Sequence, residues 1–332
     1  LDAANGEAVT DALRGLDAAV SAVPYFLNLA VTRAAIRART CLVDLGGNTD
    51  VVFQQRALDP DAREAGITVL PDQGLAPGLA GILAAWGMRD LDSVDSVKLR
   101  VGGLPQRPRG PLGYALVFSI HGLLNEYSGE AVGLKDGEID RQPTLTGREE
   151  IRFREPIGRC EAAYTSGGTS TLPWSFQGRV RELDYKTVRY PGHWERLLFL
   201  KEIGFLDTAP RAVGRVRVPP RDVLAAVLGP VLDDPEVRDL VVLRVRVRGL
   251  RGGRRILRQY EMIDWYDEAT GLTSMMRTTA FPAAESALVL ARGGCGRHGV
   301  LAAELALDGG AYLRALQARG MEIREVEAVE TA

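Results

Sequence analysis

The chain has 332 residues, a formal net charge of -2, 46% hydrophobic residues and 25% charged residues. This length corresponds to about two domains, and the composition is typical of a globular protein. The balanced charge argues against a nucleic-acid-binding protein, which needs a basic excess on one face.

Cysteine usage and hydropathy exclude further classes. The cysteines are Cys41, Cys160 and Cys295. Their number is odd and no two form a CxxC pair, so we expect neither a disulfide framework nor a zinc site, and we expect a reducing, cytoplasmic environment. The three histidines are scattered, so we expect no metal cluster. No apolar run is long enough to span a bilayer, and we expect no membrane partner.

The chain up to residue 70 alternates between short apolar runs and helical patterns. The spacing predicts strands at 17–23, 41–44 and 67–70, and helices at 27–38 and 50–64, with Asn28 as a possible N-cap. Strands and helices that alternate over short links are typical of a doubly wound parallel sheet, the Rossmann-type α/β fold.

A nucleotide-binding sheet of this type normally opens with a strand, a glycine-rich turn and a helix, and no GxGxxG motif occurs in this stretch. Residues 1–5 resemble the end of the strand that follows that opening. We therefore expect the N-terminal half of the domain, about 50 to 70 residues by the usual βαβαβ length, to be missing. The alternative is a smaller α/β sheet with nothing missing.

The pattern changes after Pro71. We predict helices at 77–88, 193–205, 221–228, 273–291 and 310–319, strands at 97–101, 114–119, 180–190, 243–248 and 256–265, and a hairpin at Asp136-Gly137. This pattern predicts an α+β region on an open, mostly antiparallel sheet. An open sheet tends to be paired or covered, so we expect a homodimer that associates through it.

Three strand ends of the first sheet are candidate cofactor contacts, because ligands bind at the carboxyl ends of parallel strands. Small residues and free helix N–H groups at these ends leave room for a nicotinamide ring and its ribose. The candidates are Ser21, Val23, Pro24, Asp44, Leu45, Gly46, Gly74 and Pro77. Ordinary turn formation explains the same residues equally well.

Polar residues of the second region are candidate substrate contacts. The loop of residues 164–171 is rich in hydroxyls and glycines and can offer donors to a carboxylate, although such a loop is also an ordinary turn. Arg189 can bind a carboxylate with two hydrogen bonds, or it can lie on a strand edge. His193 lies at a predicted helix N-terminus, which favours neutral imidazole, or it is only a cap. The row Arg244, Arg246 and Arg248 indicates a solvated or interface face of the sheet.

Several segments in this order resemble the saccharopine dehydrogenase family. They are Gly74-Leu-Ala-Pro-Gly-Leu79, Val101-Gly-Gly-Leu-Pro105, Glu126-Tyr127, Gly167-Gly168-Thr169 to Leu172, Arg189-Tyr-Pro-Gly-His193 and Leu200-Lys-Glu-Ile-Gly-Phe205. The family resemblance implies a Rossmann domain (1–75), an inserted substrate and dimerisation domain (76–278), and a helical C-terminal return to the Rossmann side (279–332), beginning near Thr279. It also implies hydride transfer between NAD or NADP and a carbon that bears nitrogen. The absent glycine-rich segment leaves NAD and NADP open.

Within the family, the compact length and the segments 102–105 and 190–193 are most similar to lysine 6-dehydrogenase, which implies oxidative deamination of an ε-amine to a semialdehyde. The ammonium must first lose a proton, so a base is needed. His193 is the first candidate for this base and Asp72 the second. The remaining candidate substrate contacts are Arg189, Thr169, Ser170, Thr171, Tyr127 and Gly103.

Two alternatives remain open. A true saccharopine dehydrogenase joins glutamate to a semialdehyde and needs a second carboxylate site, for which Arg277 or Arg100 are candidates. A non-catalytic dimeric binding protein on a degenerate dehydrogenase scaffold is the alternative from another class.

Overall fold

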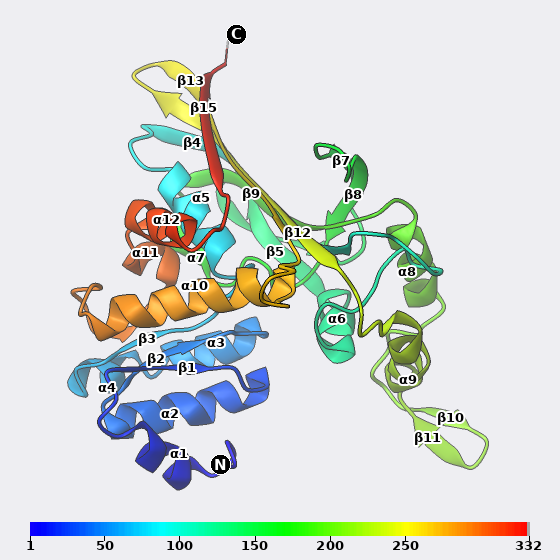
Figure 1. Cartoon of the computed structure of the whole chain (residues 1–332), viewed down its shortest axis with the longest axis horizontal. Coiled ribbons are helices and arrows are strands. Elements are labelled where there is room, and N and C mark those ends of the chain that lie inside the picture. Colours follow the sequence, from blue (N-terminus) through cyan, green and yellow to red (C-terminus); the bar gives the residue numbers. More distant parts are fainter. Residues whose placement is uncertain (331–332) are drawn as a thin grey trace.

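A computed structural model describes residues 1–330 of the chain. Its N-terminal part contains a parallel sheet with strand order β1-β2-β3-β14, as the sequence predicts for a doubly wound fold. The helices α1 and α2 lie on one side of this sheet, and α10 lies on the other (Figure 1). The helix α3 packs against α2, and α4 packs against β14 and β3. The bounds are α1 Gly6–Leu13, β1 Ala18–Ser21, α2 Asn28–Ala38, β2 Cys41–Asp44, α3 Thr49–Arg56, α4 Asp59–Glu64, β3 Thr68–Leu70 and β14 Gly299–Val300.

The second region is built on a nine-stranded mixed sheet with the order β15-β13-β12-β4-β9-β5-β6, and β8 joins β7 to β9. Only the β4–β9 pair is parallel among the described pairs of this sheet, so the mostly antiparallel character is confirmed. The bounds are β4 Ser93–Pro105, β5 Glu130–Lys135, β6 Glu138–Pro143, β7 Glu149–Arg152, β8 Arg159–Tyr164, β9 Val180–Arg189, β12 Asp239–Arg251, β13 Arg254–Trp265 and β15 Arg324–Val329.

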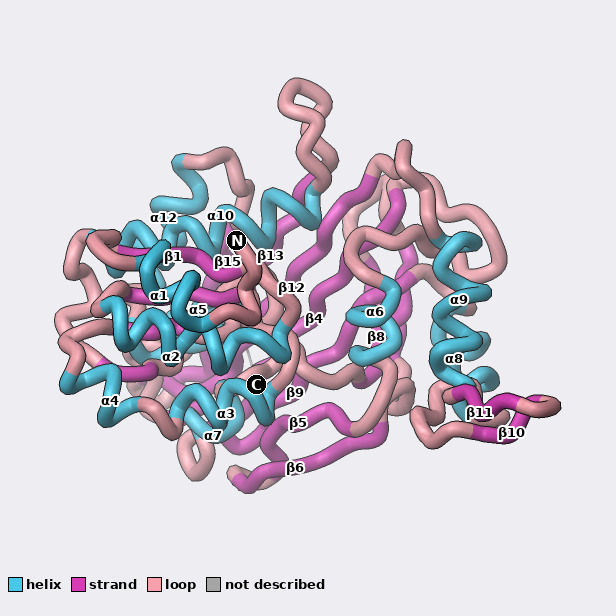
Figure 2. The backbone as a smooth tube through the Cα atoms, turned by 90° about the horizontal axis from the view of Figure 1, so that it is seen from below, coloured by secondary structure: helices cyan, strands magenta, loops and turns pink. Residues whose placement is uncertain are grey.

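Helices cover this sheet unevenly. The helices α5, α10, α11 and α12 lie between the two sheets, and α6 lies near the middle of the molecule. The helices α8 and α9 lie at the end remote from the first sheet, beside a small hairpin of β10 and β11 (Figures 1 and 2). Their bounds are α5 Leu79–Gly87, α6 Ile120–Glu126, α7 Leu172–Phe176, α8 His193–Glu202, β10 Arg211–Val213, β11 Val216–Val218, α9 Pro220–Leu232, α10 Ser274–Ala291, α11 Ala303–Ala306 and α12 Gly309–Ala318; a 3₁₀ turn spans Tyr25–Leu27.

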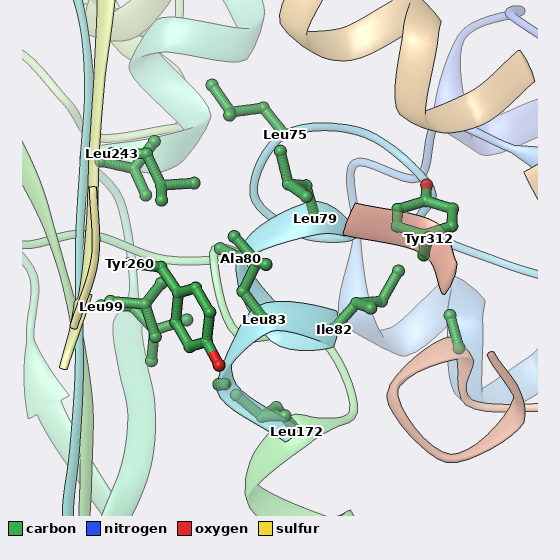
Figure 3. Packing of buried hydrophobic residues seen from close by; sticks show 14 of the residues in the cluster. Leu75, Leu79, Ala80, Ile82, Leu83, Leu99, Leu172, Leu243, Tyr260 and Tyr312 are labelled. Atoms are coloured by element: carbon green, nitrogen blue, oxygen red, sulfur yellow. The ribbon is translucent and has the colours of Figure 1, made fainter. Parts of the chain in front are cut away.

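The largest core surrounds α5, whose sequence LAGILAAWG is apolar on all sides. Leu83 packs between Leu99 and Tyr260 of the large sheet and the neighbouring helices, while Ile82 points toward Tyr312 of α12 (Figure 3). A helix that is apolar all round is stable only when it is buried on every side. This core therefore joins the inner face of the large sheet to the first sheet and holds the two sheets in a fixed relation.

Several predicted elements differ from the structure. The predicted strand at 114–119 is a loop, because its apolar side chains pack into a helical cluster instead of pairing with a strand. The predicted helix at 50–64 is two helices, since Pro60 lacks the N–H that a continuous helix requires. Asn28 lies inside α2, and Leu27 occupies the N-cap position. Pro77 precedes α5, which begins at Leu79.

The C-terminal part of the chain contacts both sheets. The helix α10 packs against β1 and β2, and β14 extends the first sheet beside β3. Afterwards β15 pairs with β13 at the edge of the large sheet. The domain bounds that the sequence suggests, 1–75, 76–278 and 279–332, stay a proposal. No helix among residues 1–330 combines the length and the apolar character that a membrane span requires.

Candidate active site at the junction of the two sheets

The carboxyl ends of β1, β2 and β3 meet at one edge of the first sheet. Ser21, the last residue of β1, is paired in register with Asp44, the last residue of β2. Asp72 follows β3, and its backbone N–H donates to Asp44 Oδ1 at 3.1 Å. The parallel topology thus brings together three polar residues that lie far apart in the sequence, which is where a doubly wound sheet binds its ligand.

Asp44 organises this edge. Its Oδ1 also accepts the Gly46 N–H at 2.8 Å, and its Oδ2 accepts the Gln55 amide at 2.6 Å. Its backbone carbonyl accepts the Gln73 N–H at 2.7 Å. Burial raises the pKa of Asp44, and the bond from Gln55 opposes that effect. Because its bonds are satisfied within the chain, Asp44 positions the two turns after β2 and β3 rather than a ligand.

Gly46 makes close packing possible at this edge. Its φ is +71°, which favours glycine, and a Cβ added there would lie 1.5 Å from Asp72 Oδ1. Any side chain at position 46 would displace Asp72. Gly74 and Gly78 form a second tight approach, since the Gly74 N–H donates to the Pro77 carbonyl at 3.0 Å.

Asp72 is a buried carboxyl group with no countercharge among residues 1–330. It is 3% exposed, and its Oδ1 has no hydrogen-bond partner among the described residues. Burial and the negative charge of Asp44 raise the pKa of Asp72 to about 7. The nearby Ser21 Oγ is also buried without a partner in residues 1–330. Two unpartnered polar atoms beside a glycine turn fit a ligand with hydrogen-bonding groups, such as the nicotinamide end of a dinucleotide.

Asp72 and the loop of residues 164–171 of the second region line one small cavity. Thr169, Ser170 and Thr171 line it together with Asp72, Pro77 and Glu304. Thr171 Oγ1 donates to Glu304 Oε1 at 2.8 Å, and Thr169 Oγ1 donates to the Val132 carbonyl at 3.0 Å. These two hydroxyls already have acceptors within the chain, and the loop faces Asp72.

The same loop connects the cavity to α6. Ser166 Oγ donates to the Asn125 carbonyl at 2.9 Å, and the Ser166 N–H donates to the Glu126 carbonyl at 2.9 Å. The Asn125 amide in turn reaches the Gly47 carbonyl at 3.5 Å, beside the β2 turn. The end of α6 therefore lies against the carboxyl edge of the first sheet, and the two regions meet there.

Glu126, the last residue of α6, is the second unusual carboxyl group at this junction. Its side chain is 31% exposed, yet its Oε2 is buried and has no hydrogen-bond partner among the described residues. This atom lies 3.6 Å from Nη2 of Arg189. Burial raises the pKa of Glu126 to about 7, although the Arg189 charge opposes that rise. A carboxyl group with this pKa can accept or return a proton near neutral pH.

Arg189 is itself buried, and it lies in one cluster with Tyr127 and His193. Its Nε donates to Tyr127 Oη at 3.2 Å, and its guanidinium lies over the Tyr114 ring at 4.7 Å. Tyr127 Oη lies 2.9 Å from His193 Nε2, and His193 Nδ1 lies 3.1 Å from the Leu112 carbonyl. A carbonyl can only accept, so Nδ1 carries the proton and Nε2 accepts from Tyr127. The hydrogen bonds therefore run in one direction, from Arg189 through Tyr127 and His193 to Leu112.

This geometry does not support His193 as the catalytic base. The imidazole is 0% exposed, and both ring nitrogens have partners. Burial and the Arg189 charge lower the pKa of His193 to about 3, so the ring is neutral. Burial and a neighbouring charge, and not the helix N-terminus, therefore account for the neutral form that the sequence predicts. Arg189 and Tyr127 are likewise only 2% and 0% exposed. Arg189, Tyr127 and His193 form one buried cluster, in which Arg189 pairs with Glu126. They do not line the cavity that Thr169, Ser170 and Thr171 line.

The remaining predicted contacts have other surroundings. Gly103 lies within β4, where a Cβ would come 2.6 Å from Met275 and 2.9 Å from Val117, so it permits packing. Val23 and Leu45 pack against core clusters, and Pro24 is exposed after β1. Sequence reasoning overlooked Glu126 as a site residue. An acidic residue at the end of a short apolar helix, directly before a tyrosine, is the local signal that was present.

Family models divide the chain at this junction. Residues 1–70 match the model described as the saccharopine dehydrogenase NADP binding domain, and residues 74–321 match the saccharopine dehydrogenase C-terminal domain. The two matches meet in the turn after β3, which contains Asp72.

Curated relatives carry the same name. The "Saccharopine dehydrogenase [NADP(+), L-glutamate-forming]" of Pyricularia oryzae is 28% identical over 61% of this chain and 46% of its own length. The protein with that name in Saccharomyces cerevisiae is 32% identical over 62% of this chain and 47% of its own length. The chain thus spans about half the length of the curated relatives that it matches.

Solved structures show the same fold. The apo saccharopine dehydrogenase (L-Glu forming) of Saccharomyces cerevisiae aligns with a TM-score of 0.79 at 21% identity, covering 99% of this chain and 88% of that one. The homospermidine synthase of Legionella pneumophila, in complex with NAD, aligns with a TM-score of 0.66 at 12% identity, covering 97% and 78%. Because one family model alone matches more than half of its residues, the chain belongs to the saccharopine dehydrogenase family.

Proposed function

We propose that this protein is an NADP- or NAD-dependent oxidoreductase that acts on a carbon bearing the nitrogen of an amino acid, with a saccharopine-type secondary amine as its first candidate substrate. The observation that carries the proposal is a pair of buried carboxylate oxygens, Asp72 Oδ1 and Glu126 Oε2, on the two sides of one junction. Neither oxygen has a hydrogen-bond partner among the described residues. The names of the curated relatives support this substrate class and the NADP preference.

The first sheet supplies the dinucleotide side of this site. Ser21, Gly46 and Asp72 lie at the carboxyl edge where a nicotinamide ring would bind, and Gly46 leaves room that any Cβ would fill. A bound dinucleotide would supply the hydride acceptor. The chain's own residues position the substrate carbon against that acceptor and control its protons.

Proton transfer is the task that the second side can perform. An amine is protonated near neutral pH and must lose a proton before its carbon can give up a hydride. Glu126, whose pKa is raised to about 7, can take that proton. Asp72, whose pKa is also raised to about 7, can accept a proton from the water that later adds to the substrate imine. Addition of water then breaks the C–N bond, giving an aldehyde and a primary amine.

Arg189 supports this assignment indirectly. Its guanidinium stays charged beneath Glu126 and limits the rise in the pKa of that carboxyl group. Its burial leaves it unavailable for a substrate carboxylate. The proposed second carboxylate contacts are also occupied, since Arg277 pairs with Asp264 and Asp267, and Arg100 pairs with Glu149 and Asp184. We therefore assign no residue to the substrate carboxylates.

L-Lysine 6-dehydrogenase is the second candidate, because the segments 102–105 and 190–193 resemble that branch. Lysine would use the same two carboxyl groups, with ammonia as the leaving amine. The cytoplasmic location and the homodimer expected from the sequence also stay predictions.

A thermal-shift titration tests the proposal. The protein is melted with NADP or NAD, each alone and with saccharopine or L-lysine, and the appearance of reduced dinucleotide is followed in parallel. A ligand that binds only the folded state raises the melting temperature by mass action. A shift with NADP that saccharopine enlarges, together with turnover, supports the saccharopine-type reaction. Turnover with lysine alone would transfer the proposal to lysine 6-dehydrogenase. Absence of any dinucleotide shift would favour a non-catalytic scaffold.

A further inference from the structure

A cavity of about 710 Å³ lies between two loops of the second region, apart from the small cavity that Asp72 lines. The β4 loop, residues 105–116, begins at the end of β4, and the α9 loop, residues 231–239, runs from the end of α9 to the start of β12. The volume of this cavity lies within the range of small-molecule sites, roughly 300–1,000 Å³. The two loops therefore enclose enough space for a ligand.

Hydrogen bonds join the two loops at both ends of the cavity. The Gln106 N–H donates to the Arg238 carbonyl at 2.8 Å, and the Leu116 N–H donates to the Leu232 carbonyl at 2.9 Å. The Gln106 side-chain amide also donates to the Asp239 carbonyl at 3.0 Å. Because backbone groups hold the loops together at both ends, the space between them is a feature of the fold and not only of its surface.

Charges of opposite sign line the two walls of this cavity. The β4 loop contributes Arg107 and Arg109, and the α9 loop contributes Asp234 and Glu236; all four are exposed. None of these four side chains forms an ion pair within residues 1–330. A simple anion would meet the two carboxylates, and a simple cation would meet the two guanidinium groups. A ligand that carries both a carboxylate and an ammonium group matches both walls.

Apolar side chains complete the lining of the cavity. They are Pro105, Ala115, Leu232 and Val237, of which Ala115 and Leu232 are buried. Apolar surface of this kind favours an aliphatic chain, because contact with it removes the chain from water. The lining as a whole suits an aliphatic amino acid in its zwitterionic form.

The β4 loop also connects this cavity to Glu126. Tyr114 lines the cavity and is 4% exposed, and its ring centre lies 4.7 Å from Cζ of Arg189. Nη2 of Arg189 in turn lies 3.6 Å from Glu126 Oε2. The same loop makes a second contact with this cluster, because the Leu112 carbonyl lies 3.1 Å from His193 Nδ1. A ligand that binds the β4 loop can therefore change the surroundings of Glu126 through packed side chains.

We propose that this cavity is a second ligand site, which binds an aliphatic amino acid zwitterion and thereby regulates the site at Glu126. The carboxylate of the ligand binds Arg107 and Arg109, and its ammonium group binds Asp234 and Glu236. Amino acids are also the substrate class of the proposed function, so an amino acid of the same reaction can act as the effector. The regulation rests on the proposed function, whereas the binding does not.

Isothermal titration calorimetry with 6-aminohexanoate, in the absence of any dinucleotide, tests the binding site. This probe carries one carboxylate and one ammonium group on an aliphatic chain. We expect the double variant Arg107→Ala/Arg109→Ala to raise Kd by at least about tenfold, because it removes both guanidinium groups that bind the carboxylate. The double variant Arg33→Ala/Arg314→Ala is the matched control, since both arginines are exposed, on α2 and α12. It should leave Kd unchanged.

Two further probes test the need for both charges. Hexanoate lacks the ammonium group and hexylamine lacks the carboxylate, so each should bind at least about tenfold more weakly than 6-aminohexanoate. Asp234→Asn/Glu236→Gln should weaken the binding of 6-aminohexanoate and not that of hexanoate. Three results would overturn the site: no saturable binding of 6-aminohexanoate, equal Kd values for the two arginine variants, or loss of binding in Glu126→Gln, which would place the probe at the candidate active site.

Steady-state kinetics at saturating substrate and dinucleotide tests the regulation. A probe that competes in the active site raises only KM, whereas an effector at a second site can change kcat. We expect 6-aminohexanoate to change the wild-type kcat by at least about twofold and to have no effect on Arg107→Ala/Arg109→Ala. An unchanged kcat at concentrations that saturate the cavity would overturn the regulatory role. If the wild type shows no turnover at all, the proposed function fails, and calorimetry still decides whether the cavity is a ligand site.

Discussion

The junction of the two regions holds two carboxyl groups whose pKa is raised to about 7: Asp72 after β3 of the first sheet, and Glu126 at the end of α6. The surroundings of these two groups differ. Asp72 lies beside a second carboxyl group, Asp44, so burial and repulsion act in the same direction. Glu126 lies beside Arg189, so burial acts against an attraction. The same pKa therefore arises from two different balances, and the two groups should respond in opposite ways when a neighbour is removed.

The largest effect should come from Glu126→Gln, because the amide cannot accept a proton. We expect turnover to fall by roughly 10²- to 10⁴-fold. In the wild type the rate of amine oxidation should rise with pH through about 7, as Glu126 loses its proton, and the variant should lack this rise. Glu130→Gln, at an exposed position of β5, is the control. If Glu126→Gln keeps the rise and Asp72→Asn loses it, the base lies on the sheet side.

Arg189→Met removes the countercharge from the α6 side. We expect the free energy of unfolding to fall by about 3–5 kcal/mol, because a buried ion pair is broken. The pKa of Glu126 should rise further, since the opposing attraction is lost. Urea denaturation measures the stability. The exposed Arg159, which pairs with Glu150, provides the control variant Arg159→Met, with an expected loss under about 1 kcal/mol. Equal losses for both variants would contradict a buried pair.

Asp72→Asn should change how stability depends on pH. The unfolded Asp72 loses its proton near its ordinary pKa of 3.8, and the folded one near 7. Between these values the folded state binds more protons, so this group lowers wild-type stability as pH rises. The variant lacks that contribution. The free energy of unfolding of the variant should therefore exceed that of the wild type by an amount that grows from about pH 4 to about pH 7 and reaches at most about 4 kcal/mol. Asparagine also tolerates the φ of 60° at this position.

Thermal melts of the two proteins across this pH range provide the measurement. Asp61→Asn is the control, because Asp61 is an exposed residue of α4 in the same N-terminal region. The stability of this variant relative to the wild type should not change with pH as that of Asp72→Asn does. A stability difference between Asp72→Asn and the wild type that stays constant with pH would show that Asp72 is not buried as a carboxylate.

Tyr127→Phe should have the smallest effect, about 1–3 kcal/mol of stability, because it leaves His193 Nε2 and one donor of Arg189 without partners. Turnover should change much less than with Glu126→Gln, since Tyr127 is fully buried and its hydroxyl contacts Arg189 and His193. Urea denaturation and steady-state kinetics of the same variant check both statements. A loss of turnover as large as that of Glu126→Gln, with full stability, would place Tyr127 in contact with substrate.

Much of the first sheet was predictable from local pattern. The strands that end at Ser21, Asp44 and Leu70 are short apolar runs bounded by turn residues, and their parallel arrangement follows from the intervening helices. Asp72 was a candidate base for the same reason, since residues just after a parallel strand lie at the ligand edge. The loop at 114–119 was mistaken for a strand because its apolar residues serve a helical cluster, which local spacing cannot reveal.

The sequence by itself determined the two-region α/β architecture, the family, and the candidate status of Asp72 and Arg189. Only the tertiary structure decided their roles. His193 looked like a base because its helix N-terminus is a local feature, but its burial and its two hydrogen-bond partners come from segments 66 and 81 residues away. Glu126 lies next to Arg189 because the tertiary fold brings the end of α6 to the end of β9. Desolvation and charge depend on what surrounds a group in space, so no local pattern could have predicted these pKa values.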